Sequence, residues 1–408
     1  MEVFVARQPI FDRAERVAGY ELLFRSSLTS SQAPRAPHYD MSSRLIVDTF
    51  LGIGLSRVTA GLPAYINCTR ELLLSGALEL LDPRQVVLEV LETTEIDDEL
   101  VAACEHLAAS GYRLALDDFV FRSEWEPLLR LAEVIKVDVL THTGEALEEL
   151  VDRLRSCNAY LLAEKVETRE GYETCRRLGF DLFQGYHFSR PEMLSRRDLD
   201  VTQLKVLRLL NSVRDLAAPD ATLEETFRSD VSLSYKLLRM ANSAAVGANG
   251  IQSIGHAIRL LGRESLYRWL ALMLVSSSRK RSGIDNELVY TILVRARMCE
   301  LIGETTGQSA RMGSLFLVGL FSQLDTLLGL EMEEALAHLV LSAEVREALI
   351  ERSGPLAPVL ELALAYEAGE WDRVQEFASE VGIRTTELPH QYLRAMAWAG
   401  EQLSGEEV

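Results

Sequence analysis

Cysteine is scarce in this sequence, and the cysteines present form no pattern. There are five in 408 residues, without a Cys-x-x-Cys pair and without a histidine at zinc-ligand spacing: Cys68, Cys104, Cys157, Cys175 and Cys299. Scattered cysteines of this kind are typical of proteins kept reduced in the cytoplasm. We therefore expect free thiols, no disulfide and no structural zinc.

Long hydrophobic runs and clusters of basic residues are also missing. The most apolar stretches, Trp269–Val275 and Leu315–Phe321, are far shorter than the ~20 residues that a membrane helix needs. Polar residues Glu2, Arg7 and Gln8 interrupt the N-terminus, which argues against a signal peptide. The net charge is −19, and acidic residues outnumber basic ones in both halves. We therefore predict a soluble cytoplasmic protein that binds neither membranes nor nucleic acid.

The composition is otherwise that of a folded protein, with 48% hydrophobic and 25% charged residues. Up to about Pro191, short β-branched or apolar runs alternate with helical patterns, as in parallel strands joined by crossover helices. There are eight such runs, the number of strands in a TIM-like (β/α)8 barrel. The expected strands are Phe4–Ile10, Val17–Phe24, Ala64–Cys68, Val86–Val90, Arg113–Leu116, Val134–Val139, Tyr160–Ala163 and Leu182–Phe188.

Strand-like segments almost vanish after the polar run Ser195–Asp198. The rest of the chain has the pattern of consecutive helices with clear start signals. Asp230 can cap one helix, and Ser253 can cap another that ends before Gly262. We predict an α/β barrel domain over residues 1–195 and an all-α helical domain over residues 198–400.

Polar side chains stand at the end of almost every expected strand of the first half. In a parallel barrel the catalytic groups lie at the carboxyl ends of the strands, so these side chains should share one face. They are Glu21, Arg25, Asn67, Glu89, Glu92, Asp117, Asp118, Lys136, Asp138, Glu164, Glu167 and Gln184.

A ring of carboxylates on one face needs countercharge, because neighbouring like charges raise each other's pKa. Oxygen ligands from Glu, Asp and Asn suit hard ions, so we expect Mg²⁺ or Mn²⁺. Two such ions could polarise a phosphodiester and activate a bridging water. Lys136 and Arg25 could then neutralise phosphate oxygens.

The same residues also fit purely structural roles. Residues that could be helix caps or turn residues are Asn67, Glu92, Asp117, Asp118 and Glu167. Residues that could be ion-pair or backbone partners are Arg25, Lys136 and Gln184. The joint pattern favours a site, because chance does not easily place oxygen ligands at most strand ends of one barrel.

These residues resemble the EAL family of cyclic di-GMP phosphodiesterases, over essentially residues 1–191. The matching motifs are Glu21–Arg25, with Leu22 in place of alanine, Ile66–Asn67, Glu89–Glu92, Asp117–Phe119, Lys136–Asp138 and Gln184–Pro191. The resemblance implies cyclic di-GMP as the ligand and a dimer formed through the barrel.

The resemblance also implies a role for each matching residue. One metal ion would be held by Glu21, Asn67, Glu89 and Asp117, and Asp118 would help to hold a second. Glu164 would be the general base, and Lys136 would assist catalysis. Supporting metal or water contacts would come from Glu167 and Gln184, contacts to the ligand from Arg25, Gln184 and Pro191, and anchoring of the following loop from Glu92.

Two departures from the EAL pattern affect the expected activity. Active members follow the double Asp with a Gly-Thr-Gly-Tyr-Ser-Ser type loop, whereas this chain has Val120–Trp125 and lacks both glycines. Their loss removes backbone freedom for folding the loop tightly over the metal ions. In addition, Lys165 replaces the glycine that usually follows the base, which places a cation beside Glu164.

The second half resembles the HDOD domain, a helical output module, over residues 198–395. The matching segments are Asp230–Ser234, Leu237–Ser243 and Ser253–Gly262. Related hydrolases need a His-Asp dipeptide, and none of the seven histidines here precedes an Asp. We therefore expect this half to bind an unidentified protein partner and to catalyse nothing.

Two functions remain open at this point. The chain could be a phosphodiesterase that linearises cyclic di-GMP with Mg²⁺ or Mn²⁺, as the intact ligand set indicates. It could instead be a receptor that binds cyclic di-GMP or a protein and signals through the helical domain. The altered loop favours the receptor, because an open two-metal site loses more turnover than binding.

Overall fold

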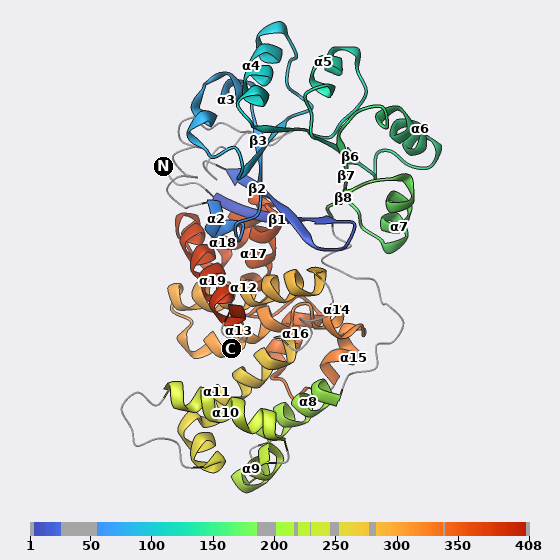
Figure 1. Ribbon diagram of the computed structural model, residues 1–408. Coiled ribbons are helices and arrows are strands. Elements are labelled where there is room, and N and C mark those ends of the chain that lie inside the picture. Colours follow the sequence, from blue (N-terminus) through green and yellow to red (C-terminus); the bar gives the residue numbers. More distant parts are fainter. Residues whose placement is uncertain are drawn as a thin grey trace.

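A computed structural model describes residues 4–25, 55–185, 201–215, 219–228, 230–244, 253–276, 283–337 and 339–404. The chain forms a barrel followed by a stack of helices, which occupy the upper and lower parts of Figure 1. Pro191 and the boundary predicted between residues 195 and 198 lie outside the described residues. The exact domain limits therefore stay a prediction.

The first half is a closed barrel whose eight strands follow one another in chain order. The predicted eight-stranded barrel is thus confirmed. The strands are β1 (Phe4–Asp12), β2 (Val17–Arg25), β3 (Ala64–Cys68), β4 (Val86–Val90), β5 (Arg113–Leu116), β6 (Val134–Asp138), β7 (Tyr160–Glu164) and β8 (Leu182–Phe183).

One strand runs against the prediction of an all-parallel barrel. β1 pairs antiparallel with both β2 and β8, while the strands from β2 to β8 pair in parallel. The reason lies in the connection, because only residues 13–16 join β1 to β2. A parallel crossover needs a dozen residues or more, whereas a short turn gives an antiparallel hairpin.

Inside the barrel, alternate strand residues form a small apolar core: Ile10, Tyr65, Val87, Ala115, Val134 and Leu162. Short helices cover the outside: α2 (Leu55–Val58), α3 (Arg70–Leu74), η1 (Ala77–Leu80), α4 (Asp98–Ala109), η2 (Ser123–Trp125), α5 (Glu126–Leu129), α6 (Glu145–Leu154) and α7 (Arg169–Leu178). This apolar core fills the barrel beneath the polar residues at the strand ends.

The second half is helical in the parts that the structure describes, as predicted. Its helices are α8 (Val201–Arg214), α9 (Asp220–Arg228), α10 (Val231–Ala244), α11 (Ile254–Ser276), α12 (Gly283–Thr305), η4 (Ser309–Arg311), α13 (Met312–Phe321), α14 (Leu324–Leu328), α15 (Met332–Ala337), α16 (Ala343–Ile350), α17 (Ala357–Ala368), α18 (Trp371–Val381), η5 (Thr385–Glu387) and α19 (Leu388–Ser404). Among the described helices, none combines the length and hydropathy required to cross a bilayer.

Both predicted helix caps are confirmed. Asp230 accepts a hydrogen bond from the backbone N–H of Leu233 at 3.1 Å, and Ser253 accepts one from that of His256 at the same distance. The helix that Ser253 caps breaks at Gly262, whose φ of 73° is left-handed. Glycine tolerates this conformation without steric cost.

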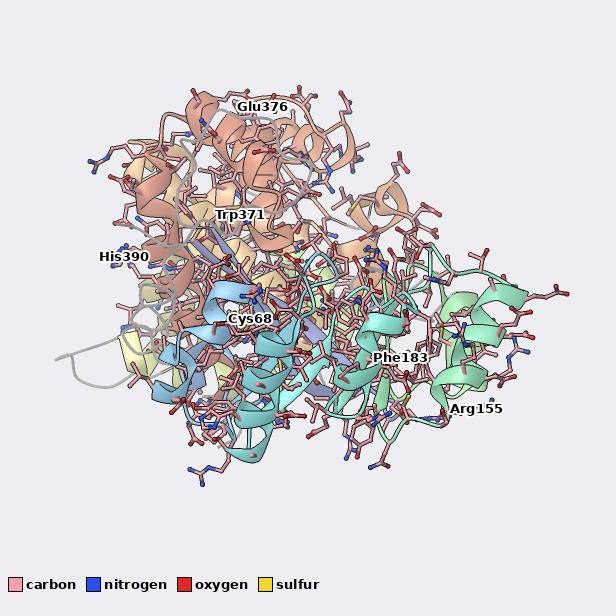
Figure 2. The ribbon with its side chains drawn as sticks, turned by 90° about the horizontal axis from the view of Figure 1, so that it is seen from above. Cys68, Arg155, Phe183, Trp371, Glu376 and His390 are labelled. Carbon is pink, nitrogen blue, oxygen red and sulfur yellow. The ribbon has the colours of Figure 1, made fainter. Side chains whose placement is uncertain are left out.

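The helical half packs mainly on the β1–β2 hairpin, and α19 also contacts the barrel helix α2. Helices α12, α17 and α19 contact these two strands, and they lie directly below the barrel in Figure 1. In the end-on view of Figure 2, Cys68 and Phe183 mark barrel strands, Arg155 lies on the outer edge, and Trp371 lies among the helices of the second half. The two halves therefore share a continuous hydrophobic core.

Candidate active site

Seven polar side chains predicted from the sequence meet where strands β2 to β8 end. They are Glu21, Asn67, Glu89, Asp117, Lys136, Glu164 and Gln184. Parallel pairing aligns them, because Asn67 lies beside Glu89 in the register. Six are buried, and Asp117 is partly exposed. The convergence lies at the barrel end where catalytic groups are found in this kind of fold.

The ammonium group of Lys136 lies at the centre of the cluster. Its Nζ lies 2.7 Å from a carboxylate oxygen of Asp117, 2.9 Å from oxygens of Glu89 and Glu164, and 3.5 Å from one of Glu21. The side chain is 1% exposed. Burial acts to lower the pKa of Lys136, but the four carboxylates raise it well above its ordinary value. Lys136 is therefore a fixed positive charge.

Glu21 is held by two amides as well as by Lys136. Its carboxylate accepts hydrogen bonds from Asn67 Nδ2 at 3.0 Å and from Gln184 Nε2 at 2.7 Å. Burial acts to raise the pKa of Glu21, but Lys136 and the amides outweigh burial and hold the pKa below its ordinary value. Glu21 is therefore ionised in the folded protein.

The other carboxyl groups of the cluster behave in the opposite way. Burial raises the pKa of Glu89, Asp117 and Glu164, and neighbouring carboxylates add to this increase, while Lys136 opposes it. The pKa of Glu164 reaches about 8. One ammonium group cannot neutralise four carboxylates, so the cluster needs either protons or further cations.

Several buried oxygen atoms of the site have no hydrogen-bond partner among the described residues. They are Oδ1 of Asn67, Oε1 and Oε2 of Glu89, Oε2 of Glu164, Oε1 of Gln184 and Oδ1 of Asp118. Two of these atoms do have ion-pair partners, because Oε1 of Glu89 lies 2.9 Å from Nζ of Lys136 and Oδ1 of Asp118 lies 3.7 Å from Nζ of Lys165. Buried oxygens without partners are costly, and each one calls for a ligand or an ion.

The chemistry of these donors fits a hard divalent cation, which prefers carboxylate and amide oxygens. Within the described parts of the chain, no three Asp, Glu, His or Cys side chains are close enough together to hold an ion as they stand. The carboxylates converge instead on Nζ of Lys136. An ion at this site would therefore also use amide oxygens such as Oδ1 of Asn67.

Comparison with known proteins agrees with a barrel followed by a helical half. Residues 68–191 match the EAL domain and residues 202–353 the HDOD domain. The uncharacterised protein YuxH of Bacillus subtilis is 34% identical, and the match covers 98% of both chains. The chain belongs to the EAL–HDOD proteins.

Two further proteins are similar to this chain, one in sequence and one as a solved structure. CdgJ of Vibrio cholerae, named a cyclic di-GMP phosphodiesterase, is 33% identical over 97% of this chain and 92% of its own length. A structure of BlrP1 from Klebsiella pneumoniae with calcium and cyclic di-GMP is 26% identical, with a TM-score of 0.39. That match covers 47% of this chain and 56% of the BlrP1 chain, about half of each.

At the rim of the EAL barrel, Lys165 fills the position where the family pattern has glycine. Its φ of 56° is left-handed, as is the 39° of Asp118. Nζ of Lys165 lies 2.5 Å from Asp138 and 3.7 Å from Asp118. Lys165 therefore neutralises the rim carboxylates, while Glu164 faces Lys136 at the centre.

The loop after Asp117 is packed by aromatic residues in place of its missing glycines. Phe119 is buried, and its ring meets that of Trp125 edge-on at 6.1 Å. The guanidinium of Arg153 lies 3.7 Å from the ring centre of Phe121. The loop therefore has a defined conformation, although its sequence lacks the glycines of the family pattern.

The structure decides against the capping roles that the sequence left open. The helix after β3 is capped by Thr69, the helix after β4 by Asp97 and the helix after β7 by Thr168. Asn67, Glu92 and Glu167 are therefore not side-chain caps, and the side chain of Asn67 points to Glu21 instead.

Four predicted residues lie at the margin of the cluster or beyond it. Glu92 is half-buried, and burial raises its pKa, with Asp117 and Asp118 adding to the increase. Glu167 is exposed and takes part in none of the hydrogen bonds and ion pairs described above for the cluster. Arg25 ends β2, but its side chain and Pro191 lie outside the described structure.

Gln8 was not predicted from the sequence, although it contacts the site. Its Oε1 accepts a hydrogen bond from Nε2 of Gln184 at 3.0 Å, and it pairs with Glu21 across the hairpin. The residues predicted from the sequence all lie towards the carboxyl ends of expected strands. Because β1 is antiparallel, it reaches the site from its amino-terminal half, so a polar residue early in the first strand was the missed signal.

Proposed function

We propose that the EAL barrel binds cyclic di-GMP and hydrolyses one of its phosphodiester bonds to give the linear dinucleotide. The observation that carries this proposal is the set of buried, unpartnered oxygens around Lys136 at the mouth of the barrel. The phosphodiesterase name of CdgJ, a relative along almost the whole chain, supports the same activity.

We infer that the oxygen donors of the cluster would hold divalent ions. Glu21, Asn67, Glu89 and Asp117 would hold one ion, and Asp118 would help to hold a second. Mg²⁺ and Mn²⁺ both suit these ligands, and such ions polarise a phosphoryl oxygen and lower the pKa of bound water. Gln184 and Glu167 would contribute supporting contacts.

The chain's own groups then have distinct tasks. Glu164 would take the proton of the attacking water through Oε2, which has no partner in the described structure. Lys136 would hold the carboxylates in place and oppose the negative charge that develops on the phosphoryl oxygens. Arg25 and Pro191 would contact the dinucleotide, and Glu92 would support the loop after Asp118.

A second candidate is a receptor that binds cyclic di-GMP without turnover. The observation that favours it is Lys165, whose ammonium group already neutralises Asp118 and Asp138. A fixed cation there would compete with the second divalent ion, and loss of that ion would reduce turnover more than binding.

The helical half would transmit the state of the barrel to a protein partner that is still to be identified. The location in the cytoplasm and the dimer through the barrel both remain predictions. Light scattering on the purified protein tests the dimer, and the mass of a single chain would contradict it.

The test of the proposed activity is incubation of purified protein with cyclic di-GMP and Mg²⁺ or Mn²⁺, followed by chromatography of the products. We expect the linear dinucleotide from the wild type and from Glu173→Ala, which changes an exposed glutamate of α7. We expect no product from Glu21→Ala. Binding without turnover in the wild type would select the receptor instead.

A further inference from the structure

The outer face of the β1–β2 hairpin is where the HDOD half meets the EAL barrel. Most barrel strands are followed by a helix that covers them, but residues 13–16 form only a turn. Strand side chains alternate between faces, so the partners of the inward-facing residues point outward toward the helical half. Among them are Arg7, Tyr20 and Leu22, which are buried.

A buried charged cluster lies within this contact. Glu287 of α12 receives the guanidinium of Arg7 on one oxygen at 3.1 Å and the hydroxyl of Tyr20 on the other at 2.8 Å. Arg7 is 8%, Glu287 9% and Tyr20 3% exposed. Both carboxylate oxygens are thus used, one for each strand of the hairpin.

The guanidinium of Arg7 makes further contacts, one with a backbone carbonyl and two with aromatic rings. Its second amino group donates a hydrogen bond to the carbonyl of Val58 at 2.5 Å, and its guanidinium lies 4.0 Å from the ring centre of Tyr20 and 4.5 Å from that of Tyr290. Burial raises the pKa of Glu287, while Arg7 and Tyr20 oppose this increase. The three side chains therefore hold one another in a single arrangement.

The next residue along each strand belongs to the catalytic cluster. Gln8 follows Arg7, Glu21 follows Tyr20, and Gln8 and Glu21 are paired across the hairpin. The amide of Gln184 donates a hydrogen bond to both of them, at 3.0 Å and 2.7 Å. If the contacts of Glu287 allowed the hairpin to shift, Gln8 and Glu21 would therefore move relative to the rest of the site.

Contacts at both ends of the hairpin leave little room for α12 to move alone. A Cβ on Gly283 would lie 2.3 Å from the carbonyl oxygen of Glu15 in the turn, and one on Gly369 would lie 2.6 Å from the side chain of Leu23. The rings of Phe4 and Trp371 are 5.9 Å apart. The helical half thus contacts the hairpin along its length.

We propose that Glu287 is a positioning residue for the barrel site, through which helix α12 of the HDOD half sets the place of Glu21 and Gln8. This role of Glu287 rests on the proposed phosphodiesterase activity only where kcat and KM are measured. It makes the helical half part of the working site, and a partner that moved α12 would change the affinity of the barrel for its divalent ion.

The test compares Glu287→Gln and Tyr20→Phe with a matched control in the full-length protein. The control is Glu300→Gln, on the same helix, where the buried carboxylate pairs with Arg268 and Arg297 within the helical half. Mn²⁺ affinity is measured by calorimetry without nucleotide, kcat and KM with cyclic di-GMP, and hydrogen exchange at the β2 amides.

We expect Glu287→Gln to weaken Mn²⁺ binding and lower kcat/KM by about 10- to 100-fold, the usual effect of removing a group that orients a metal ligand. Tyr20→Phe should change both in the same direction by less. Glu300→Gln should stay within about twofold of the wild type, and only Glu287→Gln and Tyr20→Phe should speed exchange in β2.

The inference is overturned if Glu287→Gln keeps the Mn²⁺ affinity and kcat/KM of the control while losing similar thermal stability. A wild type without turnover would refute the proposed activity alone, and the Mn²⁺ titration would still decide the role of Glu287. If the wild type bound no Mn²⁺, equal β2 exchange in Glu287→Gln and Glu300→Gln would overturn the inference, and faster exchange in Glu287→Gln alone would support it.

Discussion

Replacing Lys136 by methionine removes the ammonium group that contacts three buried carboxylates and the partly exposed Asp117. Methionine has a similar volume, so the packing around it changes little. The substitution removes the contacts of Nζ with four carboxylate oxygens, at 2.7, 2.9, 2.9 and 3.5 Å. Removing one partner of a buried ion pair costs about 3–5 kcal/mol, because the other charge stays buried without compensation.

That cost gives a measurable change in thermal stability. At about 2–4 °C per kcal/mol for a domain of this size, the barrel should unfold about 6–20 °C lower in metal-free buffer at pH 8. The deficit should shrink at pH 5.5, below the pKa of about 8 of Glu164, because its protonation removes part of the buried negative charge, and also with Mn²⁺ at pH 8. Differential scanning calorimetry measures all three conditions.

The matched control is Lys205→Met, which removes a half-exposed lysine that lies 2.9 Å from Asp230 in the helical half. An exposed pair contributes about 0–1 kcal/mol, so the control should unfold within a few degrees of the wild type. An equally small change for Lys136→Met, independent of pH and Mn²⁺, would refute the claim that Lys136 neutralises the carboxylate cluster.

Three further changes test other parts of the site. Lys165→Gly removes a half-exposed cation 3.7 Å from Asp118, and calorimetry should show about fivefold tighter Mn²⁺ binding; unchanged affinity would contradict competition between Lys165 and an ion. Gly185→Ala would place a Cβ 2.3 Å from the backbone nitrogen of Val166 at a φ of 145°. Chemical denaturation should therefore show a free energy of unfolding lower by about 1–3 kcal/mol. An unchanged denaturation midpoint would show that the backbone relaxes to accept the Cβ. The pKa of Glu164 rises from 4.5 to about 8 on folding, first through burial, so the folded state binds the extra proton. Its contribution to the free energy of unfolding is present at low pH and is lost as pH rises from about 4.5 to 8. Metal-free protein should therefore unfold at lower denaturant concentration at pH 8 than at pH 6. The opposite order would contradict a protonated Glu164.

The sequence predicted the elements that depend on local patterns. β-Branched runs such as Val86–Val90 mark strands because their side chains fit a pleated, buried surface. Asp230 and Ser253 mark helix starts because their oxygens satisfy free backbone N–H groups. The residues at the strand ends could likewise be placed on one face, since parallel strands end together.

What the sequence did not predict depends on contacts between distant segments. The direction of β1 followed from a short turn, and with it Gln8 reached the site from an unexpected side. The pairing of Arg7 with Glu287 spans 280 positions and has no local signature. The absence of glycines after Asp118 was visible in the sequence, but the aromatic packing of Phe119 that replaces them was not.

The most direct test of the phosphodiesterase proposal is turnover of cyclic di-GMP by the purified protein with Mn²⁺, measured beside Glu21→Ala and Glu173→Ala. We expect the linear dinucleotide from the wild type and Glu173→Ala and none from Glu21→Ala. Equal product from all three would show that the activity does not come from this cluster. Binding of cyclic di-GMP without any product would contradict the phosphodiesterase and leave the barrel as a receptor.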